Sequence, residues 1–337
     1  MRGRGINYDT GFFPGGYDSR PDFDSDTVQR EMAVIAEVLH CTAVRISGGD
    51  PERLSVAARH AAAAGLEVWF APFPCELGSE ELLPFFADCA DRAEEVRRTG
   101  AEVVLVLGCE MSLFSKGFIA GDTVYERIAA MRSLKFILSY KKMITKLNRF
   151  VIEAAAVARK SFGGRLTYAS GTWESIDWSH FDFVSVDAYR DAGNTGKYRK
   201  ELQKSFGHGK PVAVTEFGCC TYEGAAARGG MGWAIIDRNT EPPKLNGDYR
   251  RSEAEQVAYL RELLEIFEQE GVDSAFWFTF ATYTAPHVEG DPRSDLDMAA
   301  YGVVKMLPEG TGSPHPGFTW EPKEVFHTLA DAYGAMA

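Results

Sequence analysis

The chain has 337 residues, of which 45% are hydrophobic and 25% are charged, a composition typical of a globular protein and not of a disordered one. This length is enough to bury one large core or two smaller ones. The 48 acidic and 36 basic side chains give a formal net charge of -12, which disfavours nucleic acid and anionic membrane surfaces as partners.

The N-terminal residues 1–13 carry basic charge but no apolar stretch of signal-peptide length. No run of about 18 apolar residues occurs anywhere in the sequence, so no membrane-spanning helix is expected. We therefore expect a soluble protein that is made and kept in the cytoplasm. The sequence does not indicate its oligomeric state.

Eight short runs rich in Val, Ile, Phe and Tyr predict strands, and helical patterns lie between them. Asp24 or Ser25 is placed to cap the first helical pattern, and Gly65 is placed to end the second. The predicted strands are 4–9, 42–47, 66–73, 101–108, 165–171, 181–189, 211–218 and 274–280. The first three helical patterns are 24–40, 51–65 and 79–100.

Strands that alternate with helices imply parallel pairing, and continuous apolar strands imply a sheet covered on both faces or closed on itself. Eight such units, without a dinucleotide-binding fingerprint after the first strand, favour a (β/α)8 TIM barrel over an open doubly wound sheet. No linker divides the chain, so residues 1–337 are expected to form a single domain. Long loops at 218–250 and 281–318 would lie on the C-terminal face, as lids or walls of a site or as tolerated insertions.

Two glutamates stand at predicted strand ends. The seventh strand runs PVAVTEFG and places Glu216 at its end, and the fourth runs AEVVLVLG and is followed by Cys109 and Glu110. A charge at the end of a barrel strand can face a solvent-filled cleft instead of the core. Two carboxyl groups across a barrel mouth suit glycoside hydrolysis, and their mutual repulsion would raise one pKa and keep that group protonated.

Other strand ends carry residues suited to the same site. Arg45 closes the second strand and could hold a carboxylate ionised, and Tyr189 follows the sixth and could donate its hydroxyl. Trp277 in the eighth strand and Trp173 beyond the fifth could contact a sugar face, although core or rim packing is the favoured explanation for either tryptophan taken alone. Asp9 and Asp187 also follow strands directly, without an assigned role.

Together these positions resemble the retaining glycoside hydrolases of clan A. The resemblance rests on VRIS, VDAYR, TEFG and FWFTF, on the two strand-end glutamates, and on a closing stretch from Tyr301 through WEPKEVFHTLA. It covers residues 4–335. Over its length the chain also resembles actinobacterial proteins labelled abortive infection proteins, which would imply a role in phage defence.

The clan A resemblance implies a role for each matching residue. Glu110 would be the general acid/base and Glu216 the nucleophile of a double displacement. Arg45 and Tyr189 would hydrogen-bond to Glu216, and Trp277 would form the floor of the subsite that holds the reacting sugar.

One position departs from the family pattern. Clan A enzymes usually carry an asparagine before the acid/base that binds the sugar 2-hydroxyl, but here that residue is Cys109, and a thiol is a weak hydrogen-bonding group. The substrate could lack the usual 2-hydroxyl arrangement, Asn7 on the first strand could supply the contact, or the barrel could bind sugar without catalysis.

Other hydrolase classes find less support in the sequence. The seven histidines form no HxH or HExxH pattern, and there is no GxSxG motif or P-loop. The six cysteines lack CxxC spacing, so buried free thiols are expected, and neither a metal nor a cofactor is implied. The prediction is a retaining glycosidase acting on a small β-linked or furanosidic glycan. The alternative is a carbohydrate-binding or phage-defence barrel without catalysis.

Overall fold

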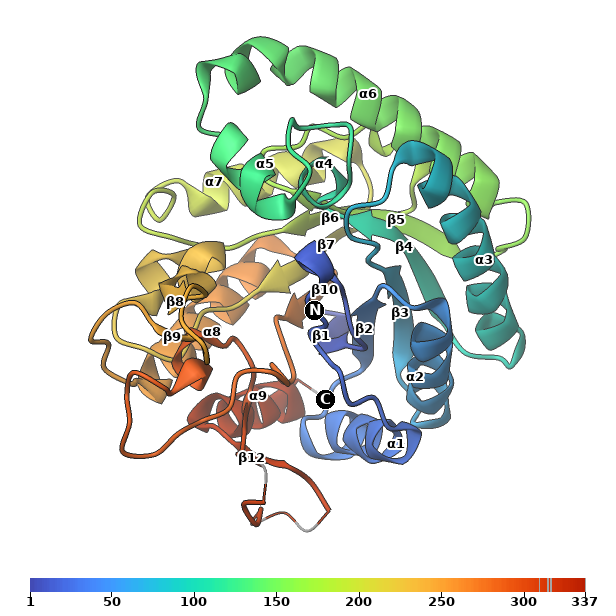
Figure 1. The fold of residues 1–337 in the computed structure, drawn as a ribbon. Coiled ribbons are helices and arrows are strands. Elements are labelled where there is room, and N and C mark those ends of the chain that lie inside the picture. The colour runs from blue at the N-terminus through green and yellow to red at the C-terminus, as the bar shows by residue number, and fades with distance from the viewer. Residues whose placement is uncertain (309, 314, 316, 337) are drawn as a thin grey trace.

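The computed structural model describes residues 1–308, 310–313, 315 and 317–336. Eight parallel strands close into a barrel in the order β1-β10-β7-β6-β5-β4-β3-β2, and helices surround them (Figure 1). This arrangement confirms the predicted (β/α)8 barrel and excludes the open sheet. The strands are β1 (Gly3–Asp9), β2 (Ala43–Gly48), β3 (Glu67–Pro72), β4 (Val103–Cys109), β5 (Arg165–Gly171), β6 (Val184–Asp187), β7 (Val212–Phe217) and β10 (Ser274–Trp277).

The outer helices begin and end largely where the sequence indicates. The Asp24 carboxylate accepts a hydrogen bond from the Thr27 N–H at 2.8 Å and caps α1. Gly65 follows α2 with φ of 79°, a left-handed conformation that glycine adopts without steric cost. The helices are α1 (Ser25–Ala33), α2 (Pro51–Ala63), α3 (Ser79–Arg98), α4 (Met111–Phe114), α5 (Val124–Ala130), α6 (Leu134–Ala158), α7 (Tyr198–Gln203), α8 (Glu253–Glu270) and α9 (Glu324–Ala335).

Apolar side chains form two separate layers, because successive residues of a strand point to opposite faces. One layer lies between the strands and the helices. The other fills the barrel interior, where the ring of Trp69 lies 5.1 Å from that of Phe183 and 4.8 Å from that of Phe276. Since these rings close the interior, polar chemistry is left to the C-terminal ends of the strands.

The two long loops expected on the C-terminal face contain short elements. The segment after β7 holds a small antiparallel pair, β8 (Ile236–Asp237) with β9 (Lys244–Leu245). The segment after β10 holds a second pair, β11 (Val304–Met306) with β12 (Trp320–Pro322). In the described part of the chain, no helix is long and apolar enough to cross a membrane.

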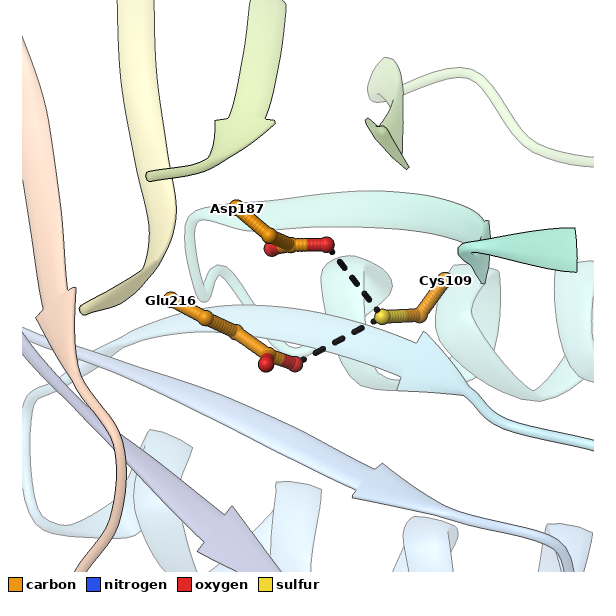
Figure 2. A group of neighbouring side chains, drawn as sticks. All are labelled: Cys109, Asp187 and Glu216. Atoms are coloured by element: carbon orange, nitrogen blue, oxygen red, sulfur yellow. Dashed lines mark hydrogen bonds between the residues drawn. The ribbon is translucent and has the colours of Figure 1, made fainter. Parts of the chain in front are cut away.

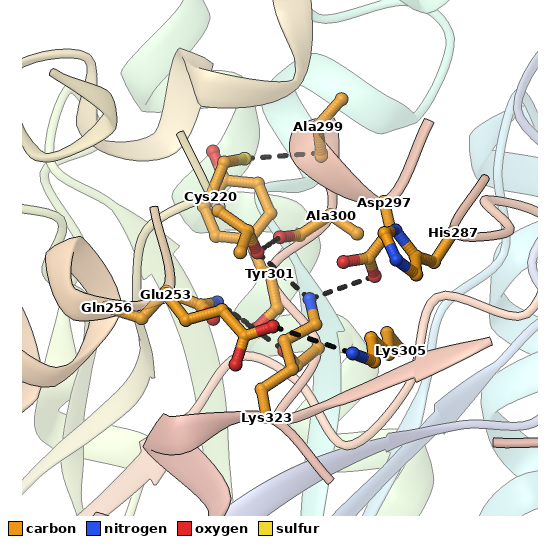
Figure 3. Close-up of polar contacts among 12 residues, drawn as sticks. Cys220, Glu253, Gln256, His287, Asp297, Ala299, Ala300, Tyr301, Lys305 and Lys323 are labelled. Carbon is orange, nitrogen blue, oxygen red and sulfur yellow. Dashed lines mark hydrogen bonds and ion pairs between the residues drawn. The ribbon is translucent and has the colours of Figure 1, made fainter. Parts of the chain in front are cut away.

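A set of buried and partly buried charges, which we call the loop network, joins these segments to the start of α8 and α9. Lys323, with no exposed side-chain surface, pairs with Asp297 at 2.9 Å and donates to the Thr221 hydroxyl at 2.9 Å (Figure 3). The network comprises Arg251, Glu253, His287, Asp295, Asp297, Lys305 and Lys323.

Candidate active site

Glu216 is the most fully supported carboxylate at the barrel mouth. Its Oε1 accepts a hydrogen bond from Arg45 Nη1 at 2.7 Å, and its Oε2 accepts one from the Tyr189 hydroxyl at 2.9 Å. The side chain lies in β7 and is largely buried. A carboxylate with a donor on each oxygen is fixed in direction, and the charged donor of Arg45 complements its negative charge.

Arg45 is itself positioned by Asn7. The same Nη1 that bonds Glu216 also donates to Asn7 Oδ1 at 2.7 Å, and Asn7 Nδ2 donates to the Thr215 carbonyl at 2.9 Å. Asn7 has no exposed surface, and both ends of its amide are engaged within the protein. The expectation that Asn7 contacts a sugar hydroxyl is therefore wrong, since this amide orients the arginine that holds Glu216.

Glu110 directly follows β4 and has an unusual backbone. It is a non-glycine residue in the left-handed region, with φ of 43°, and its N–H donates to the Ala169 carbonyl at 2.9 Å. Such a conformation costs about 1 kcal/mol or more, and strained residues of this kind concentrate at functional sites. The preceding Gly108, with φ of 86° and a bulge in the pairing with β5, makes the turn that aims Glu110.

The electrostatic surroundings of Glu110 differ from those of Glu216. Burial raises the pKa of the Glu110 carboxyl well above its usual range, and the negative charges of Asp187 and Glu216 raise it further. A carboxyl with such a pKa keeps its proton near neutral pH. The mouth thus contains one glutamate bound by two donors, one of them a guanidinium, and another whose raised pKa keeps it protonated, an asymmetry that suits acid/base chemistry.

Two residues, Tyr168 and Glu174, hold the backbone just after Glu110, a role that the sequence did not predict for them. The Tyr168 hydroxyl accepts from the Met111 N–H at 2.7 Å and donates to Glu174 Oε2 at 2.8 Å. Glu174 Oε1 also accepts from the Ser112 N–H at 3.0 Å. Glu174 therefore secures the start of α4, behind the candidate acid/base.

Cys109 and Asp187 lie beside Glu216, as Figure 2 shows. The Cys109 sulfur is 3.5 Å from Asp187 Oδ2 and 3.5 Å from Glu216 Oε1. Burial raises the pKa of the Cys109 thiol well above its usual range, and both carboxylates add to this, so the sulfur keeps its proton. The pKa of Asp187 is likewise raised by burial and by the charge of Glu216.

The structure corrects the prediction for Trp277. Its ring has no exposed surface, its indole N–H donates to the Tyr301 carbonyl at 3.1 Å, and it packs edge-on against Phe217 in the outer layer. Since Phe276 points into the barrel, the alternation of the strand turns Trp277, the last residue of β10, outward. Phe278 is partly exposed, and its ring centroid lies 6.5 Å from that of Tyr189.

Trp173 lies on the side of the mouth where Glu110 stands. It is half-buried, and its indole N–H donates to the Ser112 hydroxyl at 3.0 Å. The Tyr140 hydroxyl of α6 donates to the Trp173 carbonyl at 3.0 Å. Asp9, in contrast, uses its Oδ1 to accept from the Gly11 N–H at 2.7 Å and so stabilises a turn.

Comparison with known proteins shows the fold of the chain and does not assign its family. No protein-family model matches the sequence, and a search of curated proteins found no match. Among solved structures, the chain is similar to the GH113 β-mannanase of Alicyclobacillus acidocaldarius, with 17% identity over 100% of this chain and 98% of that one and a TM-score of 0.62. It is also similar to the family 1 β-glucosidase of Thermotoga maritima, with 12% identity, 98% and 97% coverage and a TM-score of 0.58. The coverage and the TM-scores show a shared TIM-barrel fold, and at identities this low they show the fold alone.

Proposed function

We propose that the chain is a retaining glycoside hydrolase in which Glu216 is the nucleophile and Glu110 the general acid/base. The observation that carries the proposal is the contrast between the two glutamates. Glu216 receives a donor on each oxygen, from Arg45 and Tyr189, whereas burial and nearby negative charge raise the pKa of Glu110. The fold shared with solved β-mannanase and β-glucosidase structures is consistent with this assignment.

The reaction would proceed in two displacements. In the first, Glu216 attacks the anomeric carbon while Glu110 gives its proton to the departing glycosidic oxygen, leaving a glycosyl ester on Glu216. In the second, the ionised Glu110 takes a proton from water, and the resulting hydroxide attacks the anomeric carbon and frees Glu216. Arg45 stabilises Glu216 as a leaving carboxylate, and Tyr189 fixes its direction.

Two partly exposed aromatic residues are placed to shape the subsite. Phe278 lies beside Tyr189, next to the nucleophile, and offers an apolar face for sugar C–H groups. Trp173 lies near the candidate acid/base and is placed to contact the leaving side of a substrate.

The test is a panel of aryl glycosides, both pyranosides and furanosides and both anomers, offered to the wild type, Glu216→Gln and Glu223→Gln. Glu223 lies exposed in the segment after β7, so its variant controls for a lost glutamate charge. We expect the wild type and Glu223→Gln to release aryl alcohol from the same sugar and Glu216→Gln to release none. Equal activity of all three proteins would refute the assignment of Glu216.

A second candidate is a barrel that binds carbohydrate without cleaving it, and Cys109 is the observation in its favour. The thiol occupies the place of a stronger hydrogen-bonding group that the clan resemblance leads us to expect. Glycan binding by a wild type that cleaves none of the panel would favour this candidate. The role in phage defence stays a prediction from the resemblance alone.

A further inference from the structure

The bottom of the mouth holds an excess of acidic groups. Glu110, Asp187 and Glu216 lie within one another's electrostatic reach, and Arg45 is the basic group that acts on all three. That guanidinium is committed to Glu216 and to Asn7 through its Nη1. The site therefore has more carboxyl groups than its own cation can neutralise.

Asp187 is the group that this arrangement compensates least. Its side chain is 2% exposed, and among the described residues its Oδ1 has no hydrogen-bond partner. Its Oδ2 lies 3.5 Å from the weak thiol donor of Cys109, and the nearby Thr215 hydroxyl and Arg45 charge offset the increase in its pKa only in part. Without a ligand this carboxyl keeps its proton, and a ligand that brings a positively charged donor would favour the carboxylate and release that proton.

The position of Asp187 indicates which part of a substrate it would meet. Asp187 and Glu216 are register partners on adjacent strands β6 and β7. One oxygen of each, together with the Cys109 sulfur, lies within 4.8 Å of the others. If Glu216 attacks the anomeric carbon, the Asp187 carboxylate lies within reach of the substituent on the neighbouring ring carbon.

We infer that Asp187 binds an ammonium group at that position, so that the preferred substrates are glycosides of 2-amino-2-deoxy sugars with a free amine. The inference rests on the proposed function for the placement of the sugar. An ammonium donates up to three hydrogen bonds, and its positive charge favours the ionised form of Asp187, which a neutral hydroxyl does not. An N-acetyl group removes that charge and adds a carbonyl oxygen beside carboxylates.

A divalent metal ion fits the same three side chains less well. Glu216 Oε1, the oxygen nearest the sulfur, already accepts from the Arg45 guanidinium at 2.7 Å. A metal bound there would lie beside a fixed positive charge and would have to displace the proton of a thiol whose pKa is raised. An organic ammonium needs neither change.

The first experiment measures binding and needs no turnover. Isothermal titration at about pH 6, where sugar amines are protonated, would compare glucosamine, galactosamine and mannosamine with glucose, galactose and mannose and with the three N-acetyl derivatives. We expect one amino sugar to bind the wild type at least about tenfold more tightly than its hydroxyl and N-acetyl counterparts, a difference of about 1.4 kcal/mol. Equal affinity within every set of three would overturn the inference.

Asp187→Asn provides the matched variant, because it keeps the shape of the side chain and cannot ionise when an ammonium binds. We expect the tenfold preference to fall to about one in this variant and to persist in Glu223→Gln. A preference that survives Asp187→Asn would overturn the inference, as would zinc or magnesium ions that displace the amino sugar from the wild type.

Aryl glycosides separate the inference from the proposed function. Turnover of neutral glycosides without any preference for the free amine would support the proposed glycosidase and refute the amino-sugar inference. Selective binding of the amino sugar without turnover of any glycoside would support the Asp187 binding site and refute the proposed catalysis.

Discussion

The protein contains two clusters of largely buried charge that differ in balance. In the loop network each cation is bonded to an anion: Lys323 pairs with Asp297 at 2.9 Å, and Arg251 pairs with the same Asp297 at 2.9 Å and with Asp295 at 3.2 Å. At the barrel mouth Arg45 faces Glu216 and two further carboxyl groups that it does not bond. The paired charges of the loop network hold the loops in place. The carboxyl groups at the mouth that lack a cation have shifted pKa values and are free to bind a ligand.

Replacing the cation of each cluster gives the sharpest contrast. Arg45→Met would leave Glu216 with the Tyr189 hydroxyl as its donor and without the guanidinium that fixes its direction and stabilises it as a leaving carboxylate. Misplacement of a reacting group by about 1 Å can cost about 100-fold in rate, so we expect turnover to fall by about 100-fold or more. Steady-state kinetics on the substrate found in the panel measure this fall. Unchanged turnover by a folded variant would remove Arg45 from the mechanism.

Glu110→Gln tests the other carboxyl at the mouth. We expect a fall of about 10²–10⁴-fold for aryl glycosides with poor leaving groups, and a smaller fall for dinitrophenyl glycosides, which leave without a proton. Because the acid form is required and its pKa is raised, wild-type kcat/KM should decline as the pH rises through that pKa. This alkaline limb should vanish in Glu110→Gln, and a variant that keeps the limb would assign it to another group.

Lys323→Met is the counterpart in the loop network. Removing one partner of a buried ion pair typically costs about 3–5 kcal/mol, so we expect a large loss in the free energy of unfolding. Turnover per folded molecule should stay near the wild-type value, since Lys323 bonds only to the loops. Urea denaturation and active-site titration measure the two quantities, and lost turnover with unchanged stability would contradict the division between the clusters.

Asp187→Asn should change stability in the opposite direction and by the smallest amount. The pKa of Asp187 is raised in the folded protein, so the folded state binds this proton more tightly than the unfolded chain does. The resulting stabilisation is present at acid pH and is lost as the pH rises through the folded pKa. We expect Asp187→Asn to be more stable than the wild type by about 1–3 kcal/mol at pH 8 and the advantage to disappear near pH 4. A variant less stable than the wild type at pH 8 would show that the charge is compensated.

The sequence predicted the barrel because each strand is a compact apolar run between helical patterns, and such local signals survive folding. Strand-end position alone was also enough to select Glu110, Glu216, Arg45 and Tyr189 as candidates. The structure places both Arg45 and Tyr189 in contact with Glu216.

The sequence predictions were wrong in two situations. One is where a shift of one position along a strand decides to which face a side chain points, and the other is where a residue far away in the sequence supplies the hydrogen-bond partner. Phe276 and Trp277 are successive residues of β10, and one position along the strand decides between the barrel interior and the outer layer. The Asn7 amide accepts a hydrogen bond from Arg45 and donates one to the Thr215 carbonyl, and both partners lie far away in the sequence. The unpartnered oxygen of Asp187 is likewise a property of packing, and no sequence pattern could have revealed it.

The most direct test of the account follows the configuration of the first sugar released. Proton NMR of the wild type acting on the glycoside that it cleaves would record the anomer before it equilibrates in water. Double displacement through Glu216 predicts that the product keeps the configuration of the substrate. Release of the opposite anomer would contradict Glu216 as the nucleophile.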